Sequence, residues 1–284
     1  MGSPTVLRRR LGGELGKLRA SRELNAKDVA AALGWSASKL SRIESGLVPL
    51  QERDAAKLLA HYGVTSADEV KHFLGLTRQS RQQGWWHAYG DALPDWFRAY
   101  VGFESDAAKI VTYQCELVPG LLQTEAYARS VIRAMNPMES AEEVERRVAL
   151  RMDRQQILDR HEPPQLWAII SEAVIRRPVG GSPAMAEQLS HLAAMADERP
   201  NITVQILPFS AGAHAAMGSS FSILSFDDIP GSVAYSEGPT SSTYSERPHE
   251  IARHEDAFDR LMASSVQPER SIAWLKEVAE EYSR

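Results

Sequence analysis

The chain has 284 residues, of which 43% are hydrophobic and 24% are charged, a composition typical of a globular protein with about two domains. No apolar run reaches 18 residues and no apolar segment follows the basic residues near the start, so we expect neither a membrane span nor a secretory signal. A single cysteine, Cys115, excludes an intramolecular disulfide framework and is typical of the reducing cytoplasm, where we expect the protein to act.

The net charge of −5 is unevenly distributed along the chain. Residues 1–80 contain 13 Lys and Arg against 8 Asp and Glu, whereas the rest contains 19 against 29. A basic first part on an acidic body indicates that only the first part binds a polyanion. The same asymmetry also arises by chance in many proteins, so charge alone is a weak signal for polyanion binding and motifs must support it.

The first 76 residues predict five short helices with short connections, a compact bundle. Asn25 is a suitable N-cap for the second helix, which we expect to end at Gly34. Ser36 caps the third helix, which ends at Gly46, and a capping box at Ser66–Glu69 begins the fifth. The second and third helices, joined by a tight turn, therefore have the length and chemistry of a helix-turn-helix.

In such a pair the first helix braces the second, and the second enters the major groove of duplex DNA. Leu40 and Ile43 must face the bundle, which leaves one stripe of the third helix facing outward. Arg42 is the long donor in that stripe, and bidentate contact of arginine with guanine is the commonest specific base contact. Any two adjacent short helices give a similar pattern, which is the alternative interpretation.

The residues predicted to contact DNA differ in their roles. Small side chains let the backbone approach the floor of the groove, the helix N-terminus favours a phosphate, and the lysines on the flanks suit phosphates. The predicted DNA-binding residues are Lys27, Ser36, Ala37, Ser38, Lys39, Ser41, Arg42 and Ser45.

Four strings stand out in residues 7–64: a leading "LR", then "VAAALGWS", "SRIESG" and "LLAHYGV". Together they resemble the Xre-type, lambda-repressor-like DNA-binding domain. The resemblance implies that Arg19 of the first helix pairs with Glu44 and locks the first helix to the third. It also places Lys27 near the position where family members often have a glutamine that contacts a phosphate.

Residues 77–100 change in character and contain Trp85, Trp86, Tyr89, Trp96 and Phe97. We predict an aromatic-rich linker whose rings pack at a seam between two domains. A stacking platform for nucleic acid is the alternative, but few basic residues lie between the rings.

From residue 101 to 284 the pattern is mixed and predicts an α+β domain with a small, mostly antiparallel sheet and flanking helices. The predicted strands are "PPQLWAII", "NITVQILP", "SSFSILSF" and "GSVAYSEG", and the last two are expected to form an antiparallel hairpin. We therefore expect a DNA-binding domain at 5–76, the linker at 77–100 and a regulatory or partner-binding domain at 101–284.

Longer strings in the C-terminal part include "ELVPGLLQTEAYARSVI", "LWAIISEAVIRRPVGG" and "QILPFSAGAHAAMGSSFSILSF". They resemble the C-terminal domain of WhiJ-like, antitoxin-like transcriptional regulators of actinobacteria. The resemblance covers almost the whole chain and implies a small partner protein encoded nearby.

Several C-terminal residues are candidates for a ligand pocket. They are Trp167, Glu172, Phe209, His214, Tyr235 and Glu237. The rings could line a cavity, and two carboxylates near strand ends could do acid–base work. Ordinary packing and local bonds to backbone or arginine are the alternative.

The chain carries no pattern typical of an enzyme. His249 and His254 are five residues apart, whereas a zinc-protease helix needs a spacing of four. No phosphate-binding loop and no nucleophile elbow occurs. We expect no catalysis, no cofactor and no metal. We expect instead a homodimer that binds double-stranded DNA as a transcription regulator and is controlled by a partner protein or ligand. The alternative is an antitoxin-like protein that mainly neutralises a small partner.

Overall fold

The computed structural model describes residues 2–227, 229–238 and 241–284. By its contacts the chain divides into two compact units, Met1–Ala88 and Tyr89–Arg284.

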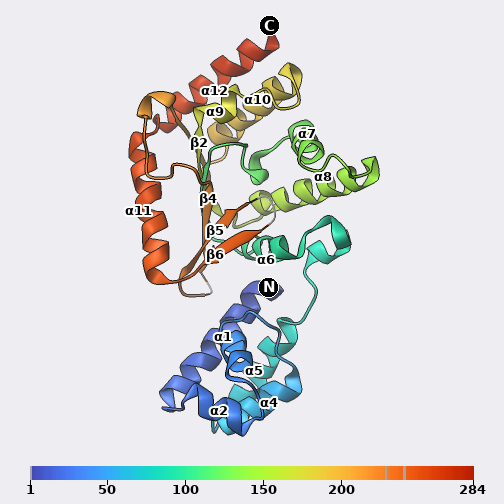
Figure 1. Ribbon diagram of the computed structural model, residues 1–284, viewed down its shortest axis with the longest axis vertical. Coiled ribbons are helices and arrows are strands. Elements are labelled where there is room, and N and C mark those ends of the chain that lie inside the picture. Colours follow the sequence, from blue (N-terminus) through green and yellow to red (C-terminus); the bar gives the residue numbers. More distant parts are fainter. Residues whose placement is uncertain (1, 228, 239–240) are drawn as a thin grey trace. The chain divides into compact units, whose positions relative to one another are not determined.

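The N-terminal unit is a bundle of short helices around one apolar core (Figure 1). Its helices are α1 (Pro4–Ser21), α2 (Ala26–Ala32), α3 (Ala37–Glu44), α4 (Glu52–His61) and α5 (Ala67–Gln79). Leu15, Leu40 and Leu58 are fully buried in the core. The five helices predicted from the sequence are confirmed.

Local chemistry explains where α2 and α3 begin and end. Asn25 accepts a hydrogen bond from the backbone N–H of Lys27, and Ser36 accepts one from Lys39. Gly34 and Gly46 then follow the helices with φ of 68° and 65°, a left-handed conformation in which glycine carries no steric penalty. The predicted N-caps and glycine stops of the two helices are confirmed.

In the C-terminal unit, six strands of the described residues form one mixed sheet in the order β3-β2-β1-β4-β5-β6. The strands are β1 (Lys109–Gln114), β2 (Gln165–Ser171), β3 (Ile202–Leu207), β4 (Phe221–Ser225), β5 (Ser232–Glu237) and β6 (Ser242–Ser245). The β1–β2 and β2–β3 pairs are parallel, and the remaining pairs are antiparallel. The α+β architecture and the β4–β5 hairpin are confirmed, whereas β1 and β6 were not predicted. Asp228, in the connection of that hairpin, lies outside the described residues.

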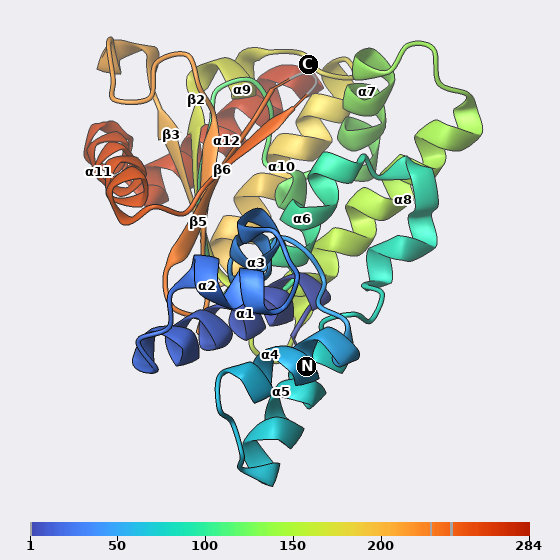
Figure 2. The same ribbon diagram turned by 60° about the horizontal axis from the view of Figure 1, so that its bottom comes forward.

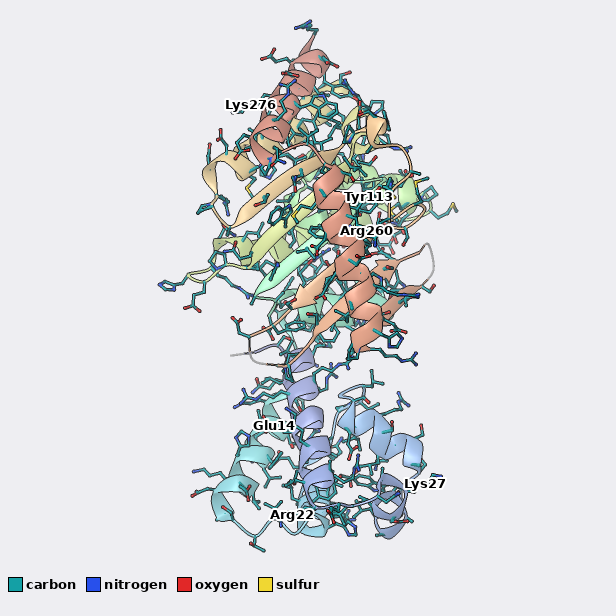
Figure 3. All side chains as sticks on the ribbon, turned by 90° about the vertical axis from the view of Figure 1, so that its left-hand side faces the viewer. Glu14, Arg22, Lys27, Tyr113, Arg260 and Lys276 are labelled. Atoms are coloured by element: carbon teal, nitrogen blue, oxygen red, sulfur yellow. The ribbon has the colours of Figure 1, made fainter. Side chains whose placement is uncertain are left out.

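Helices cover both faces of this sheet. They are α6 (Asp95–Glu104), α7 (Glu125–Met135), α8 (Ala141–Gln155), α9 (Glu172–Arg176), α10 (Ser182–Glu198), α11 (Pro248–Ser264) and α12 (Pro268–Ser283). One face lies beneath α11, whereas α6, α7, α8 and α10 lie on the other side (Figure 2). Figure 3 looks onto α11, with Tyr113 of the sheet beneath it.

The aromatic segment 77–100 is divided between the two units. Trp86, which belongs to the N-terminal unit, is buried and lies next to the exposed Trp85. Phe97 and Tyr100 lie one helical turn apart on α6, and both rings contact Tyr235 of β5. The second half of the segment is therefore a helix of the C-terminal unit that packs on its sheet.

Candidate nucleic-acid interface and C-terminal cavity

The turn between α2 and α3 holds the two helices in a compact pair. The backbone N–H of Trp35 donates to Ala30 at 2.8 Å, and Leu40 and Ile43 are buried in the core. The period of the helix then leaves a polar stripe of α3 facing outward. Its exposed residues are Ser36, Ala37, Ser38, Ser41, Arg42 and Ser45.

Lys39 and Lys27 differ in their surroundings. Lys39 donates to Asp54 of α4 at 2.9 Å, and its Nζ lies 4.0 Å from the centre of the Trp35 ring. A phosphate bound by Lys39 would therefore have to compete with Asp54. Lys27 is exposed on α2 (Figure 3).

The structure brings Arg19 of α1 and Glu44 of α3 together in a bidentate ion pair. Arg19 Nε donates to Glu44 Oε1 at 2.7 Å, and Nη2 donates to Oε2 at 2.9 Å. The hydroxyl of Tyr62 donates to Glu44 Oε1 at 3.0 Å. The hydrogen bonds that Arg19 donates to Glu44 raise the pKa of Arg19, which stays charged and neutralises the carboxylate beside the exposed stripe.

We expect Arg19→Ala to lower the free energy of unfolding of the N-terminal unit by about 2 kcal/mol, because it leaves the half-buried Glu44 carboxylate without its cation. Urea unfolding of the full chain measures this. Arg78→Ala, which breaks an exposed pair with Glu52, is the control and should cost less than about 1 kcal/mol. Equal losses for both variants would remove the locking role of Arg19.

Beside this pair, α1 approaches the end of α3 closely at Gly12, a contact that was not predicted from the sequence. A Cβ at Gly12 of α1 would lie 2.5 Å from the carbonyl oxygen of Ile43 and 2.6 Å from that of Glu44. The residue at 12 must therefore be glycine for α1 to lie against the end of α3. The available signal was a glycine pair in the interior of a predicted helix, which often marks close packing.

The six residues predicted to line a C-terminal pocket do not converge. The strand register places Trp167 in the same row as Val111 and Ala234, on the face beneath α11. Tyr235 follows Ala234, so it points to the opposite face, and Glu237 points the same way. Trp167 therefore cannot share one pocket with Tyr235 and Glu237. Nothing in the sequence indicated this, because which residues of two strands share a face depends on the register between the strands.

The remaining predicted residues make local contacts. Glu172 accepts from the backbone N–H of Phe209 at 2.9 Å and pairs with Arg176. His214 lies against Tyr113, on the face beneath α11. Glu237 accepts from the Tyr235 hydroxyl at 2.9 Å. Since β1 and β4 separate β2 from β5, the ends that carry the two glutamates are roughly 14 Å apart. The two carboxylates therefore do not form an acid–base pair.

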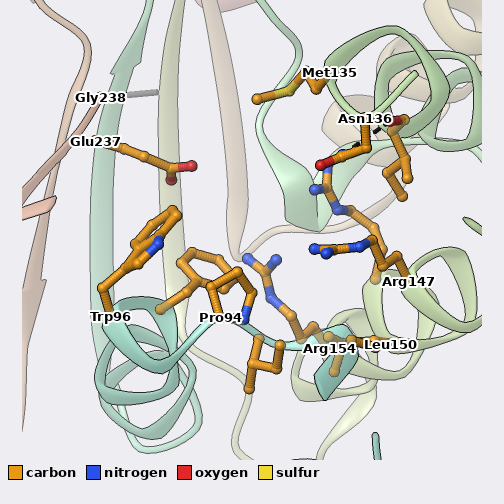
Figure 4. Close-up of a pocket in the computed structure, with 14 residues that line it drawn as sticks. Pro94, Trp96, Met135, Asn136, Arg147, Leu150, Arg154, Glu237 and Gly238 are labelled. Atoms are coloured by element: carbon orange, nitrogen blue, oxygen red, sulfur yellow. Dashed lines mark hydrogen bonds between the residues drawn. The ribbon is translucent and has the colours of Figure 1, made fainter. Parts of the chain in front are cut away.

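A cavity of about 270 Å³ lies on the opposite face of the sheet from α11, between α6, α7, α8 and the end of β5. Trp96, Phe97, Leu150 and Met135 supply apolar walls. Three arginines of α8 also line it, at positions 147, 151 and 154, and Glu237 lies across from Arg147 and Arg154 (Figure 4). Of the predicted pocket residues, only Glu237 lines this cavity.

The three arginines are held by different partners. Arg154 makes a bidentate pair with Glu104 at 2.7 and 2.9 Å, and Arg147 donates to Glu139 at 2.6 Å. Arg151 donates to the neutral amide of Gln123 at 2.7 Å. Burial, and then the charge of Arg154, lower the pKa of Arg151 to about 10. The cavity wall therefore holds a guanidinium whose charge is poorly compensated.

The two units define a helix-turn-helix protein with a separate α+β domain, and comparison with known families agrees. Residues 10–73 match a helix-turn-helix domain, and residues 97–277 match a domain of unknown function, DUF5753. The second match spans more than half of the chain, which therefore belongs to the DUF5753 family. No curated protein and no solved structure matches the chain. In the part of the chain that the structure describes, no helix is both long and apolar enough to cross a membrane.

Proposed function

We propose that the protein is a transcription regulator that binds double-stranded DNA in a sequence-specific way through α3. The observation that carries the proposal is the exposed stripe of α3, in which Arg42 is the long donor among small residues. The match to a helix-turn-helix domain supports it independently. Regulators of this class do not need catalysis, and we propose no catalytic role for Glu172 or Glu237.

The finer assignment is also a proposal. The motifs of residues 7–64 favour an Xre-type domain, and those of the C-terminal part favour a WhiJ-like regulator of actinobacteria. A homodimer would place two α3 helices on half-sites about one helical turn apart on a palindromic operator. The C-terminal unit would control this binding through a ligand or a partner protein.

We expect Arg42→Ala to weaken binding to the operator by about 1–3 kcal/mol and to relax discrimination at one base pair, because the variant loses a bidentate base contact. Binding titrations against the operator and its single-base variants measure both effects. Lys27→Ala is the matched control, since a lost phosphate contact weakens binding to all duplexes alike. It also lowers the slope of log affinity against log salt concentration by about one. Uniform weakening by Arg42→Ala would contradict its base-reading role.

A second candidate is an antitoxin-like protein that binds and neutralises a small partner, with DNA binding as autoregulation. The observation that favours it is the segment between β3 and β4, where Phe209 and Met217 are 62% and 68% exposed. Gel shifts on the protein's own promoter, with and without the product of the neighbouring gene, test this second candidate. DNA binding that is unaffected by the neighbour favours the first candidate.

A further inference from the structure

The cavity beside α8 combines a cationic wall with an apolar wall. Arg147, Arg151 and Arg154 lie at i, i+4 and i+7 of α8, so they form one stripe along the helix. Figure 4 shows the guanidinium groups of Arg147 and Arg154 directed into the space between α6 and α7. A charged stripe of this kind normally faces solvent, yet Arg154 is only 6% exposed in its side chain.

The positive charge of this stripe is incompletely paired within the described residues. Glu104 compensates Arg154 and Glu139 compensates Arg147, but Arg151 has only the amide of Gln123. The Nε of Arg147 is buried without a hydrogen-bond partner, as is Oε2 of Glu139. Buried polar groups normally find partners, so the Nε of Arg147 is a donor that the described residues leave unused.

Glu237 is the acidic group that faces the stripe. It is exposed, and one of its oxygens accepts from the Tyr235 hydroxyl. Its charge favours the charged forms of Arg151 and Arg154 and thus acts as a partial counter-charge at a distance. An anion in direct contact with Arg151 would replace this weak compensation by a short, charge-assisted bond.

The size and walls of the cavity limit what would fit. A volume of about 270 Å³ is near the lower end of small-molecule sites, which span roughly 300–1,000 Å³. Trp96 and Phe97 of α6 give flat apolar surfaces, and Met135 and Leu150 give aliphatic ones. These surfaces suit a ring or a short chain and do not suit a strongly hydrated ion alone.

We infer that this cavity is a binding site for a small carboxylate with an aromatic or aliphatic body. The carboxylate contacts Arg151 and Arg147, and the apolar body lies against Trp96 and Phe97. One part of the inference rests on the proposed function, namely that this molecule is the effector that controls DNA binding. The site itself is defined by the C-terminal unit alone.

Calorimetric titration of the full chain with matched probes tests the inference. The carboxylates are 3-phenylpropionate and indole-3-acetate, and the controls are the amide of each acid and phenethylamine. We expect saturable binding of at least one carboxylate, with its amide weaker by about tenfold or more. Absence of saturable binding up to millimolar carboxylate, or equal binding of acid and amide, overturns the inference.

Variants of the cavity sharpen the test. Arg151→Gln should weaken carboxylate binding by about tenfold or more, and Arg151→Lys, which keeps the charge, should recover part of it. Glu237→Gln should strengthen binding, since it removes a repelling carboxylate. Tighter binding of L-phenylalanine than of 3-phenylpropionate, weakened by Glu237→Gln, would show a zwitterion site and overturn the assignment to a simple carboxylate.

Binding of the same probe in the presence of operator DNA separates the two proposals. Carboxylate binding that changes DNA affinity supports both. Carboxylate binding by a chain that never binds DNA selectively supports the cavity and contradicts the proposed function. Selective DNA binding by a chain that binds none of the carboxylates supports the proposed function and contradicts the cavity proposal.

Discussion

Gly12→Ala is expected to destabilise the N-terminal unit by about 2–3 kcal/mol and to displace α3. The new methyl group would meet two carbonyl oxygens at the end of α3 within 2.6 Å, and backbone atoms cannot rotate away as a side chain can. The higher helix propensity of alanine, worth about 1 kcal/mol, offsets only part of this clash. Hydrogen exchange of the α3 amides and urea unfolding of the full chain measure the loss, and affinity for DNA should fall with it.

Gly13→Ala provides a matched control in the next residue of the same helix. A Cβ at Gly13 meets nothing within 4 Å, so only the helix propensity changes. This variant should be as stable as the wild type or more stable by up to about 1 kcal/mol. If Gly12→Ala and Gly13→Ala behave alike, α1 does not lie as close to α3 as described.

Glu104→Ala is expected to lower the free energy of unfolding of the C-terminal unit by about 3–5 kcal/mol. Glu104 and Arg154 are 2% and 6% exposed, so the variant leaves a buried guanidinium without its anion. Burial alone would lower the pKa of Arg154, but Glu104, together with Tyr100 and Glu237, raises it above the ordinary value, so the arginine is charged in the wild type. Urea unfolding followed by circular dichroism, with hydrogen exchange in α8, measures the loss.

Two further variants identify the cause of that loss. Glu104→Leu combined with Arg154→Met removes both charges and should recover most of the stability, because an apolar pair of similar volume replaces a buried ion pair at little cost. Glu277→Ala breaks an exposed pair with Arg270 and should cost less than about 1 kcal/mol. A loss in Glu104→Ala no larger than that in Glu277→Ala would contradict the burial argument.

The N-terminal unit was predictable because its signals are local. The Ser36 cap, the glycine stops and the buried Leu40 and Ile43 all follow from residues within a few positions of one another. The Arg19–Glu44 contact spans 25 residues and came instead from resemblance to a family. The glycine pair at 12 and 13 was visible in the sequence, but only the carbonyl groups of a different helix show that glycine is required at 12.

The C-terminal site was not predictable because it depends on which face each strand presents. The register between strands is not visible in the sequence, so Trp167 and Tyr235 were placed together although they point apart. The arginine stripe of α8 was present in the sequence at helical spacing. Such a stripe usually faces solvent, and only the packing of α6 and Glu104 shows that this one is enclosed.

Selection of bound duplexes from a random library, carried out in parallel with the wild type and Arg42→Ala, is the most direct test of base reading by α3. We expect the wild type to enrich one motif, palindromic if the protein binds as a dimer. Arg42→Ala should enrich the same motif with one base pair per half-site relaxed. Enrichment of no motif by the wild type, or of an identical motif by both proteins, would contradict sequence reading by Arg42 of α3.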